Sequence, residues 1–404
     1  MYWILWNGQS QTNSIELKFK AIKTYYYLFL TLALPFCVQG QDFYYPEKNG
    51  SWEMRTPETF DINPKHLEDA VSFAEDNEYS GGRDLRVAIV KGFAREPYHQ
   101  ILGPTKKHGG PSGMILKNGY VIAQWGDTKR VDMTFSVTKS YLSTLAGLAV
   151  DRGLIASTDD YLTDYIWDST FDGEHNQKIR WDHLLTQTSD WSGSIWGLHD
   201  WADRPSKKGA IDDWKNRALN EPGTYFKYND VRVNVLSYSL LNVWRKPLPQ
   251  VLKTEIMDPI GASTTWRWFG YRNSWTPIDG VQVESVSGGG HSGGGLFVST
   301  EDHARFGLLF LSKGSWNGKQ LLSEKWIEQA TTASAANPNY GYLWWLNKKG
   351  PRYWEGAAEN IYYAAGFGGN FIIVIPDQNV VVVTRWIEPA QVATFMEKVL
   401  KAIE

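Results

Sequence analysis

The stretch that decides the fold of this chain is Phe135-Ser136-Val137-Thr138-Lys139-Ser140. Apolar residues dominate the run from Val137 to Val150, and Gly153 follows it as a residue suited to the left-handed end of a helix. The run therefore predicts a helix that is buried rather than lying on the surface. Ser136 and Lys139 are three residues apart, so a helix that begins here presents both side chains on one face.

A serine and a lysine at the mouth of a buried helix have a chemical use. Lys139, with no formal charge near it along the helix, would lose affinity for its proton when desolvated and can act as a base. Ser136 would have helix N–H groups and the positive end of the dipole facing developing negative charge. The alternative is a helix cap followed by a surface lysine. Ser136 opens the only Ser-x-x-Lys in the chain.

The composition argues against several classes of protein. The 404 residues are 42% hydrophobic and 21% charged, which suits one large globular domain or two lobes. A formal net charge of −3 gives no electrostatic basis for binding nucleic acid. The eight histidines show no metal-ligand spacing and no cysteine pair accompanies them, so neither a metal nor another cofactor is predicted. The loop from Trp191 to Trp214 is expected to wall a substrate cleft, with Trp191, Trp196 and Trp201 as candidate contacts, and most of the other tryptophans among the twenty are expected in the core.

The N-terminus has the pattern of an export signal. A basic stretch from Lys18 to Lys23 precedes an apolar run from Tyr25 to Val38 that is too short for a comfortable transmembrane helix. We therefore expect residues 1–40 to be a leader, and the mature protein to be periplasmic or secreted without a stable membrane span. Lipid attachment at Cys37 is the weaker alternative, because bulky residues precede it.

The order of the expected elements predicts an α+β fold of sandwich type. A helix is expected at Asn63–Asp76, a hairpin at Gly113–Trp125, and helical segments broken by loops over 155–290. The strand-rich ending comprises Tyr342–Leu346, Ile361–Ala365, Phe371–Ile375 and Val380–Thr384, and a closing helix runs from Pro389 to Glu404. This order predicts one antiparallel sheet built from both chain ends and flanked by helices, with a helical lobe inserted and the active cleft between them.

A second motif lies in the segment Glu221–Asp230. A Pro-Gly turn delivers Tyr228 just ahead of an apolar helix, and a phenol beside the Ser–Lys pair can relay a proton. A buried structural tyrosine is the alternative. Tyr271-Arg272-Asn273 is a competing motif of the same kind, but it lacks the Pro-Gly lead-in and the following helix.

Two glycine-rich segments are candidates for substrate binding. Glycines between two expected strands, as in Gly366–Asn370, indicate close approach by another group such as a ligand. Gly369, with Gly368 beside it, is a candidate oxyanion donor, and a bulge or hairpin turn is the alternative. The segment Gly288–Gly295 lacks the Gly-Lys-Ser/Thr end of a phosphate loop, and its His291 either faces the cleft or has a structural role.

Together these motifs resemble the serine β-lactamase and penicillin-binding-protein superfamily. Ser136-x-x-Lys139, Tyr228-x-Asp230 and a C-terminal glycine strand occur in the order of that family, and the segments 179–189, 222–224 and 294–302 are similar to its connecting segments. The resemblance implies a hydrolase domain at 85–404 preceded by an extension at 41–84. It is strongest to the class C β-lactamase-related branch, which includes family VIII carboxylesterases and 6-aminohexanoate-dimer hydrolases.

The resemblance implies an exported serine hydrolase that cleaves an ester or amide bond of a small-molecule or peptide-like substrate through an acyl-enzyme on Ser136. Lys139, neutral in its buried site, would take the serine proton, and Tyr228 would relay it and protonate the leaving group. The N–H groups of Ser136 and Gly369 would hold the oxyanion.

The chain departs from the family pattern at two places. Asp230 stands where Asn is usual, and Gly366-Phe367-Gly368 stands where β-lactamases carry Lys-Thr-Gly or His-Thr-Gly. The missing cation and hydroxyl argue against β-lactam hydrolysis, unless Arg232 or Arg272 supplies a cation from another loop. The alternatives to an esterase or amidase are a β-lactamase or D-alanyl-D-alanine peptidase, and a non-catalytic binding protein of the same fold.

Overall fold

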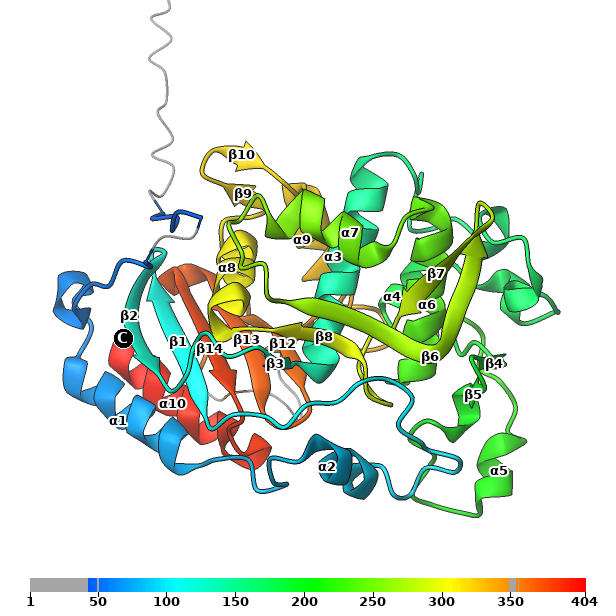
Figure 1. Ribbon diagram of the computed structural model, residues 1–404, viewed down its shortest axis with the longest axis horizontal. Helices are drawn as coiled ribbons and strands as arrows, with labels where there is room; N and C mark the ends of the chain where they lie inside the picture. The colour runs from blue at the N-terminus through cyan, green and yellow to red at the C-terminus, as the bar shows by residue number, and fades with distance from the viewer. Residues whose placement is uncertain (1–42, 49–50, 349–353, 355) are drawn as a thin grey trace, which may run out of the picture. The chain divides into compact units, whose positions relative to one another are not determined.

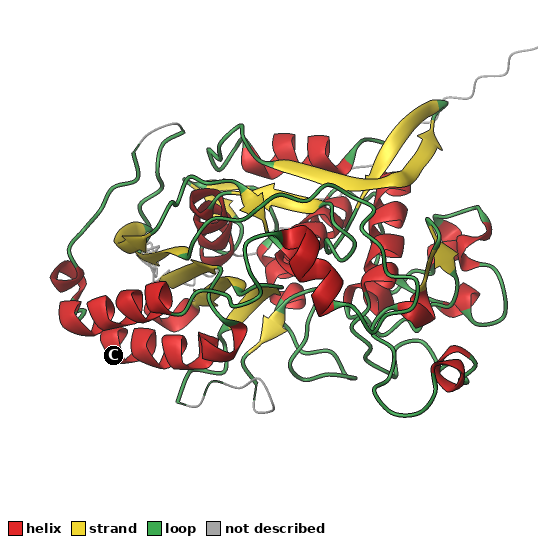
Figure 2. Cartoon of the chain, turned by 60° about the horizontal axis from the view of Figure 1, so that its bottom comes forward, coloured by secondary structure: helices red, strands yellow, loops and turns green. Residues whose placement is uncertain are grey.

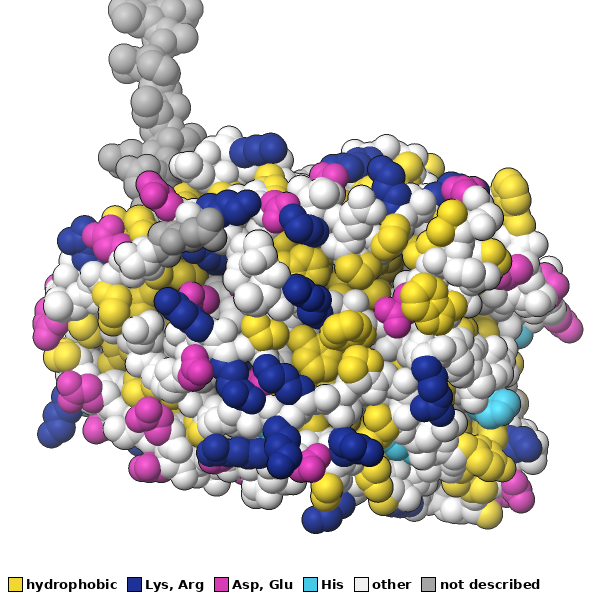
Figure 3. Space-filling view, in the orientation of Figure 1, with side chains coloured by type: hydrophobic (Ala, Val, Ile, Leu, Met, Phe, Trp, Pro, Cys, Tyr) yellow, Lys and Arg dark blue, Asp and Glu magenta, His cyan; other side chains and the backbone are white. Residues whose placement is uncertain are grey.

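A computed structural model describes residues 43–48, 51–348, 354 and 356–404, so the expected leader at 1–40 lies outside the described residues. Among the described residues, no helix combines the length and the apolar character that a membrane crossing requires. Basic and acidic side chains are interspersed on the face of the molecule shown in Figure 3. That face therefore presents no extended field of one sign to a charged partner.

The main sheet joins the two ends of the chain, as the sequence predicts. Its strands run in the order β11-β12-β13-β14-β1-β2, and every neighbouring pair is antiparallel. The two ends meet where β1 pairs with β14, with Ile115 opposite Val382. The strands are β1 (Ser112–Lys117), β2 (Tyr120–Trp125), β11 (Trp345–Leu346), β12 (Tyr362–Gly366), β13 (Asn370–Ile375) and β14 (Val380–Arg385).

Helices cover both faces of the main sheet. Figure 1 shows α8 (Thr300–Leu311) on one side, and α1 (Pro64–Asp76) with α10 (Val392–Ile403) on the other. The valines of β14 are consequently buried on both faces, which explains their unbroken apolar run. Asn63 begins α1 as expected, since its side chain accepts hydrogen bonds from the N–H groups of Lys65 and His66.

The helix predicted after Ser136 is the shared core element of the two lobes. α3 (Thr138–Asp151) is buried from Thr138 to Ala149, and Gly153 follows it with the expected positive φ of 67°. α3 packs against β12 of the main sheet and against the helices of the inserted lobe. The remaining helices are α2 (Leu85–Gly92), α4 (Trp181–Leu185), α5 (Ile211–Lys215), α6 (Asp230–Trp244), α7 (Leu248–Leu252) and α9 (Glu324–Ala330).

The stretch 155–290 is not only helical, and this corrects the sequence-based expectation. It contains a long hairpin of β6 (Arg267–Ile278) and β7 (Val281–Val286), which Figure 2 shows as the pair of long strands at the upper right. The turn Asp279-Gly280 has positive φ at both residues, and Asp-Gly is a strong hairpin signal. A second sheet forms in the order β3-β8-β6-β7, and the short strands are β3 (Asp132–Met133), β4 (Ser194–Ile195), β5 (Leu198–His199), β8 (Gly295–Val298), β9 (Ser315–Trp316) and β10 (Lys319–Gln320).

Candidate active site

Ser136 and Lys139 are brought together at the start of α3. Ser136 lies in a short 3-10 turn, Phe135–Val137, and Lys139 Nζ donates a hydrogen bond of 2.8 Å to its Oγ atom. Phe135, just before the serine, has a left-handed φ of 50°, a conformation that bulky residues rarely adopt. Such strain at one residue persists only where the surrounding structure fixes it, and here it accompanies a half-buried serine beside a fully buried lysine.

Ser136 opens into a cavity of about 690 Å³. Arg204, Tyr228, His291 and the turn Gly366–Gly368 line the cavity with it. A large part of the wall is aromatic, and includes Phe93, Phe135, Phe226, Trp345, Phe367 and Phe371. A cavity of this size, largely apolar with a few converging polar groups, suits a small organic substrate.

Tyr228 approaches Lys139 with the face of its ring. Lys139 Nζ lies 4.7 Å from the centre of the Tyr228 ring, and the ring stacks on Trp345 at 5.6 Å between centroids. The predicted trio of Ser136, Lys139 and Tyr228 is therefore assembled at one place in the structure.

Asp230 supplies a charge that the sequence had not placed near Lys139. Its Oδ1 lies 2.5 Å from Lys139 Nζ, and the two side chains are only 2% and 1% exposed. Burial alone would raise the pKa of Asp230, but Lys139 and then Arg204 outweigh burial and hold it well below its usual range. Lys139 is thus one half of a buried ion pair at rest, which differs from the expected uncharged surroundings.

A chain of polar contacts extends from Asp230 through Arg204 to His291. Arg204 Nη1 lies 2.7 Å from Asp230 Oδ2 and 2.5 Å from Asp203 Oδ1, and its Nη2 contacts His291 Nδ1 at 3.2 Å. A guanidinium can only donate, so His291 Nδ1 accepts. His291 Nε2 then carries the hydrogen and donates to Glu96 at 2.5 Å.

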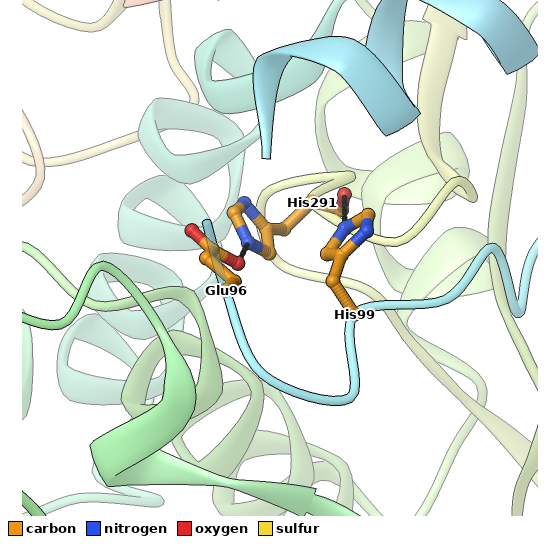
Figure 4. Close-up of side chains that lie close together, drawn as sticks. All are labelled: Glu96, His99 and His291. Atoms are coloured by element: carbon orange, nitrogen blue, oxygen red, sulfur yellow. Dashed lines mark hydrogen bonds and ion pairs between the residues drawn. The ribbon is translucent and has the colours of Figure 1, made fainter. Parts of the chain in front are cut away.

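Figure 4 shows His291 flanked by Glu96 and His99. These three residues, and likewise Asp203, Asp230 and His291, bring their ligand atoms within 4.8 Å of one another, as metal ligands do. The atoms are already engaged, however. Arg204 forms ion pairs with both Asp203 and Asp230, and His291 Nε2 donates a hydrogen bond to Glu96. Hydrogen bonds and ion pairs therefore account for both groups.

Gly289 shows why the segment Gly288–Gly295 is rich in glycine. A Cβ atom at Gly289 would lie 1.8 Å from Asp230 Oδ1 and 2.3 Å from Lys139 Nζ. No larger residue fits at this position without displacing the buried ion pair. The segment therefore makes room for the Lys139–Asp230 pair, and it also places His291 at the cavity.

The glycines at the end of β12 and in the turn after it have different surroundings. Gly366 abuts the turn that carries Ser136, because a Cβ at Gly366 would lie 3.3 Å from the backbone nitrogen of Ser136. Gly368 lines the cavity. Gly369 instead packs against Ile387, where a Cβ would come within 1.6 Å of the carbonyl oxygen. The structure thus places Gly366 beside the backbone nitrogen of Ser136, and the role of Gly369 as an oxyanion donor stays a prediction.

The sequence matches the beta-lactamase family over residues 114–385. The chain belongs to this family. Solved structures with a similar fold include a Bacillus anthracis protein provisionally named a 6-aminohexanoate-dimer hydrolase, with 14% identity, a TM-score of 0.57, and coverage of 90% of this chain and 89% of that one. A hydrolase with promiscuous acyltransferase activity has 15% identity and a TM-score of 0.56 over 84% and 98% of the two chains. A family VIII carboxylesterase has 16% identity and a TM-score of 0.52 over 73% and 93%.

Three tryptophans expected at the cleft of this beta-lactamase-family protein lie elsewhere. Trp191 is buried and donates to the carbonyl of Thr170, while Trp196 packs on Tyr271. Trp201 stacks on a histidine. None of the three is among the described residues that line the cavity. The aromatic wall comes instead from the segments before α6 and around β11 and β12, whose convergence depends on the tertiary fold.

The cations named as substitutes for the missing lysine also lie away from the cavity. Arg232 is buried between Asp190 and Asp200, and Arg272 contacts Gln100 at the surface. Arg204 is the arginine that lines the cavity. The sequence pattern did not single out Arg204, which lies in the irregular segment between Trp201 and the start of α6. Its role depends on contacts with three other segments, which contain Glu96, Asp230 and His291, and sequence spacing does not reveal these contacts.

Proposed function

We propose that this chain is an exported serine hydrolase that cleaves an ester or amide bond through an acyl-enzyme on Ser136. One observation carries the catalytic part: Lys139 Nζ lies 2.8 Å from Ser136 Oγ at the wall of a 690 Å³ cavity. The export part rests on the basic and apolar pattern of residues 1–40. The esterase and amide-hydrolase names among the structural neighbours support the choice of substrate class.

Acylation begins when Ser136 Oγ attacks the substrate carbonyl and Lys139, in its unprotonated form, accepts the serine proton. The tetrahedral oxyanion is held by the backbone N–H of Ser136 and by a backbone N–H of the Gly366–Phe367 segment, which lies next to the turn of Ser136. When the intermediate collapses, the bond to the leaving group breaks and Tyr228 passes the proton to that group. Water then attacks the acyl-enzyme, with Lys139 and Tyr228 returning the proton to Ser136 Oγ.

A fluorophosphonate probe tests the assignment of the nucleophile. Intact-mass spectrometry should show one adduct on the wild type, mapped to Ser136, and no adduct on Ser136→Ala. Ser143→Ala is the matched control, because Ser143 lies on α3, the helix that follows the turn of Ser136, and its buried Oγ has no hydrogen-bond partner among the described residues. An adduct on another serine would refute the nucleophile, and an inert wild type would favour the binding-protein alternative.

β-Lactamase activity remains the second candidate because Arg204 places a cation at the cavity. Two carboxylates and His291 already share that guanidinium, which weakens its attraction for a substrate carboxylate. An ester or uncharged amide needs no such partner. We therefore favour the esterase or amidase.

A further inference from the structure

The carboxylate of Asp230 lies between two cations. Its Oδ1 is 2.5 Å from Lys139 Nζ and its Oδ2 is 2.7 Å from Arg204 Nη1. If Lys139 were the only partner, the buried carboxylate would hold the lysine as a tight ion pair, because an unpaired charge inside a protein is costly. A lysine held in that state has no lone pair with which to accept the proton of Ser136.

Arg204 is fixed in this position from several sides. Its side chain contacts Asp203 and His291, and its backbone N–H donates to Glu96 Oε1 at 3.2 Å. Its φ of 48° is left-handed, which is unfavourable for an arginine. The guanidinium keeps its charge at every working pH. The fold therefore keeps a permanent cation on the far oxygen of the carboxylate that holds Lys139.

We infer that Arg204 is a positioning residue that draws the charge of Asp230 away from Lys139 and so allows Lys139 to act as the base for Ser136. The inference rests on the proposed function. Its physical basis is that a second cation on the same carboxylate both competes for the negative charge and repels the ammonium form of the lysine. Asp230 and Arg204 then act as a matched pair, in which each residue compensates for the other.

This pairing predicts how substitutions of Arg204 and Asp230 should combine. Arg204→Gln leaves Asp230 to Lys139 alone, so Lys139 should hold its proton more tightly. Asp230→Asn in the same chain removes the charge that traps the lysine, so the double variant should recover. Because the two residues are in contact, their losses of stability need not add, so the recovery that supports the inference must appear in the labelling rate of the folded protein and not only in the thermal midpoint.

The test compares the wild type with R204Q, R204K, D230N and the double variant R204Q/D230N. The readouts are the rate of fluorophosphonate labelling, kcat and KM for a p-nitrophenyl ester, and the thermal midpoint. We expect R204Q to lower kcat and the labelling rate by about tenfold or more, with KM little changed. R204K should keep more activity than R204Q, and R204Q/D230N should regain at least half of the lost labelling rate on a logarithmic scale.

Other outcomes overturn the inference in distinguishable ways. A rise in KM with an unchanged labelling rate would make Arg204 a substrate-binding cation instead. A double variant as slow as R204Q, with a thermal midpoint like that of the wild type, would remove the charge-sharing role. If R204Q does not fold, R204Q/D230N is compared with D230N: once residue 230 carries no charge, removing the cation should leave the labelling rate unchanged, and a further large loss would overturn the inference. A wild type that reacts with neither the fluorophosphonate nor the ester would refute the proposed function together with the inference. An active wild type whose variants have the same kcat and labelling rate would refute the inference alone.

Discussion

The Nζ atom of Lys139 lies over the face of the Tyr228 ring, 4.7 Å from its centre. This contact is a cation–π interaction made by the ring, and it does not involve the hydroxyl group. The structural and the chemical contributions of Tyr228 are therefore separable by substitution.

Tyr228→Phe should keep the thermal stability of the wild type and lose most of the activity. Phenylalanine retains the ring over Lys139 and its stacking on Trp345, while the proton relay is removed. A general acid–base group contributes about 10²- to 10⁴-fold to rate, so kcat for an ester should fall by that order. Tyr228→Leu is the matched control, since it also loses the ring and about 1 kcal/mol of stability. Full activity in the phenylalanine variant would rule out the relay.

Asp230→Ala should destabilise the protein far more than loss of a surface ion pair does. The change leaves Lys139 as a buried cation without its carboxylate, while the partly exposed Arg204 keeps its ion pair with Asp203. Breaking a buried pair by removing one partner costs about 3–5 kcal/mol. Glu324→Ala, which breaks the exposed pair with Lys313, should cost less than about 1 kcal/mol. Urea unfolding of both variants checks the difference, and equal costs would contradict the buried pair.

The sequence predicted those parts of the fold and site that depend on local pattern. The apolar run after Ser136 predicted α3, the Asn118-Gly119 turn predicted the β1–β2 hairpin, and the spacing of Ser136 and Lys139 predicted their contact. Each of these depends on residues close together in the chain. The antiparallel sheet of both chain ends followed from the order of the strands and is also confirmed.

The parts that the sequence missed depend on long-range packing. Arg204 and Glu96 lie in irregular segments, and only the tertiary fold brings them to His291 and Asp230. The contact of Gly366 with the turn that carries Ser136, and that of Gly369 with Ile387, likewise depend on how the end of β12 packs. The β6–β7 hairpin had a local signal in Asp279-Gly280, which the analysis overlooked.

Stability should fall as the pH drops, and His303 should be one cause. Burial, and then the Arg385 guanidinium, lower the pKa of His303 well below its ordinary value, while its ring nitrogens contact Thr134 and Tyr141. Below about pH 6.5 the unfolded chain binds a proton at this histidine that the folded chain does not bind, so the free energy of unfolding decreases. Between about pH 6.5 and 5.5 the wild type should lose roughly 1 kcal/mol that His303→Gln does not lose. Urea unfolding at both values tests this, and parallel losses in the two proteins would contradict it.

Esters should be better substrates than β-lactams. The strand segment beside Ser136 offers Gly366 and Phe367 in place of a cation and a hydroxyl, and Arg204 is shared by Asp203 and Asp230. Loss of a charge-assisted hydrogen bond to a substrate carboxylate costs roughly 1.5–3 kcal/mol, or about ten- to a hundredfold in kcat/KM. Comparing a p-nitrophenyl ester with a chromogenic cephalosporin decides the matter, and a faster cephalosporin would restore the β-lactamase reading.

Asn339 is expected to select substrates that carry a hydrogen-bond donor. It lines the cavity, is 8% exposed, and its Oδ1 has no hydrogen-bond partner among the described residues. A buried acceptor without a partner costs about 1–3 kcal/mol, so this atom is a liability in the free protein, and a rotation of the Asn339 side chain would present it to the N–H of an amide bound in the cavity. Asn339→Leu, which keeps the size of the side chain, should therefore leave the thermal midpoint unchanged or higher.

The same variant should lower kcat/KM by about tenfold for a substrate with an N–H group near the acyl carbon, and leave p-nitrophenyl acetate unaffected. Asn347→Leu is the matched control, because Asn347 is also buried but its side chain donates to the carbonyl of Ala358 and accepts from the N–H of Trp354. That control should lose stability without changing the preference between the two substrates. Equal losses of kcat/KM on both substrates in Asn339→Leu, or a lower thermal midpoint, would show that Asn339 supports the wall of the cavity and does not read the substrate.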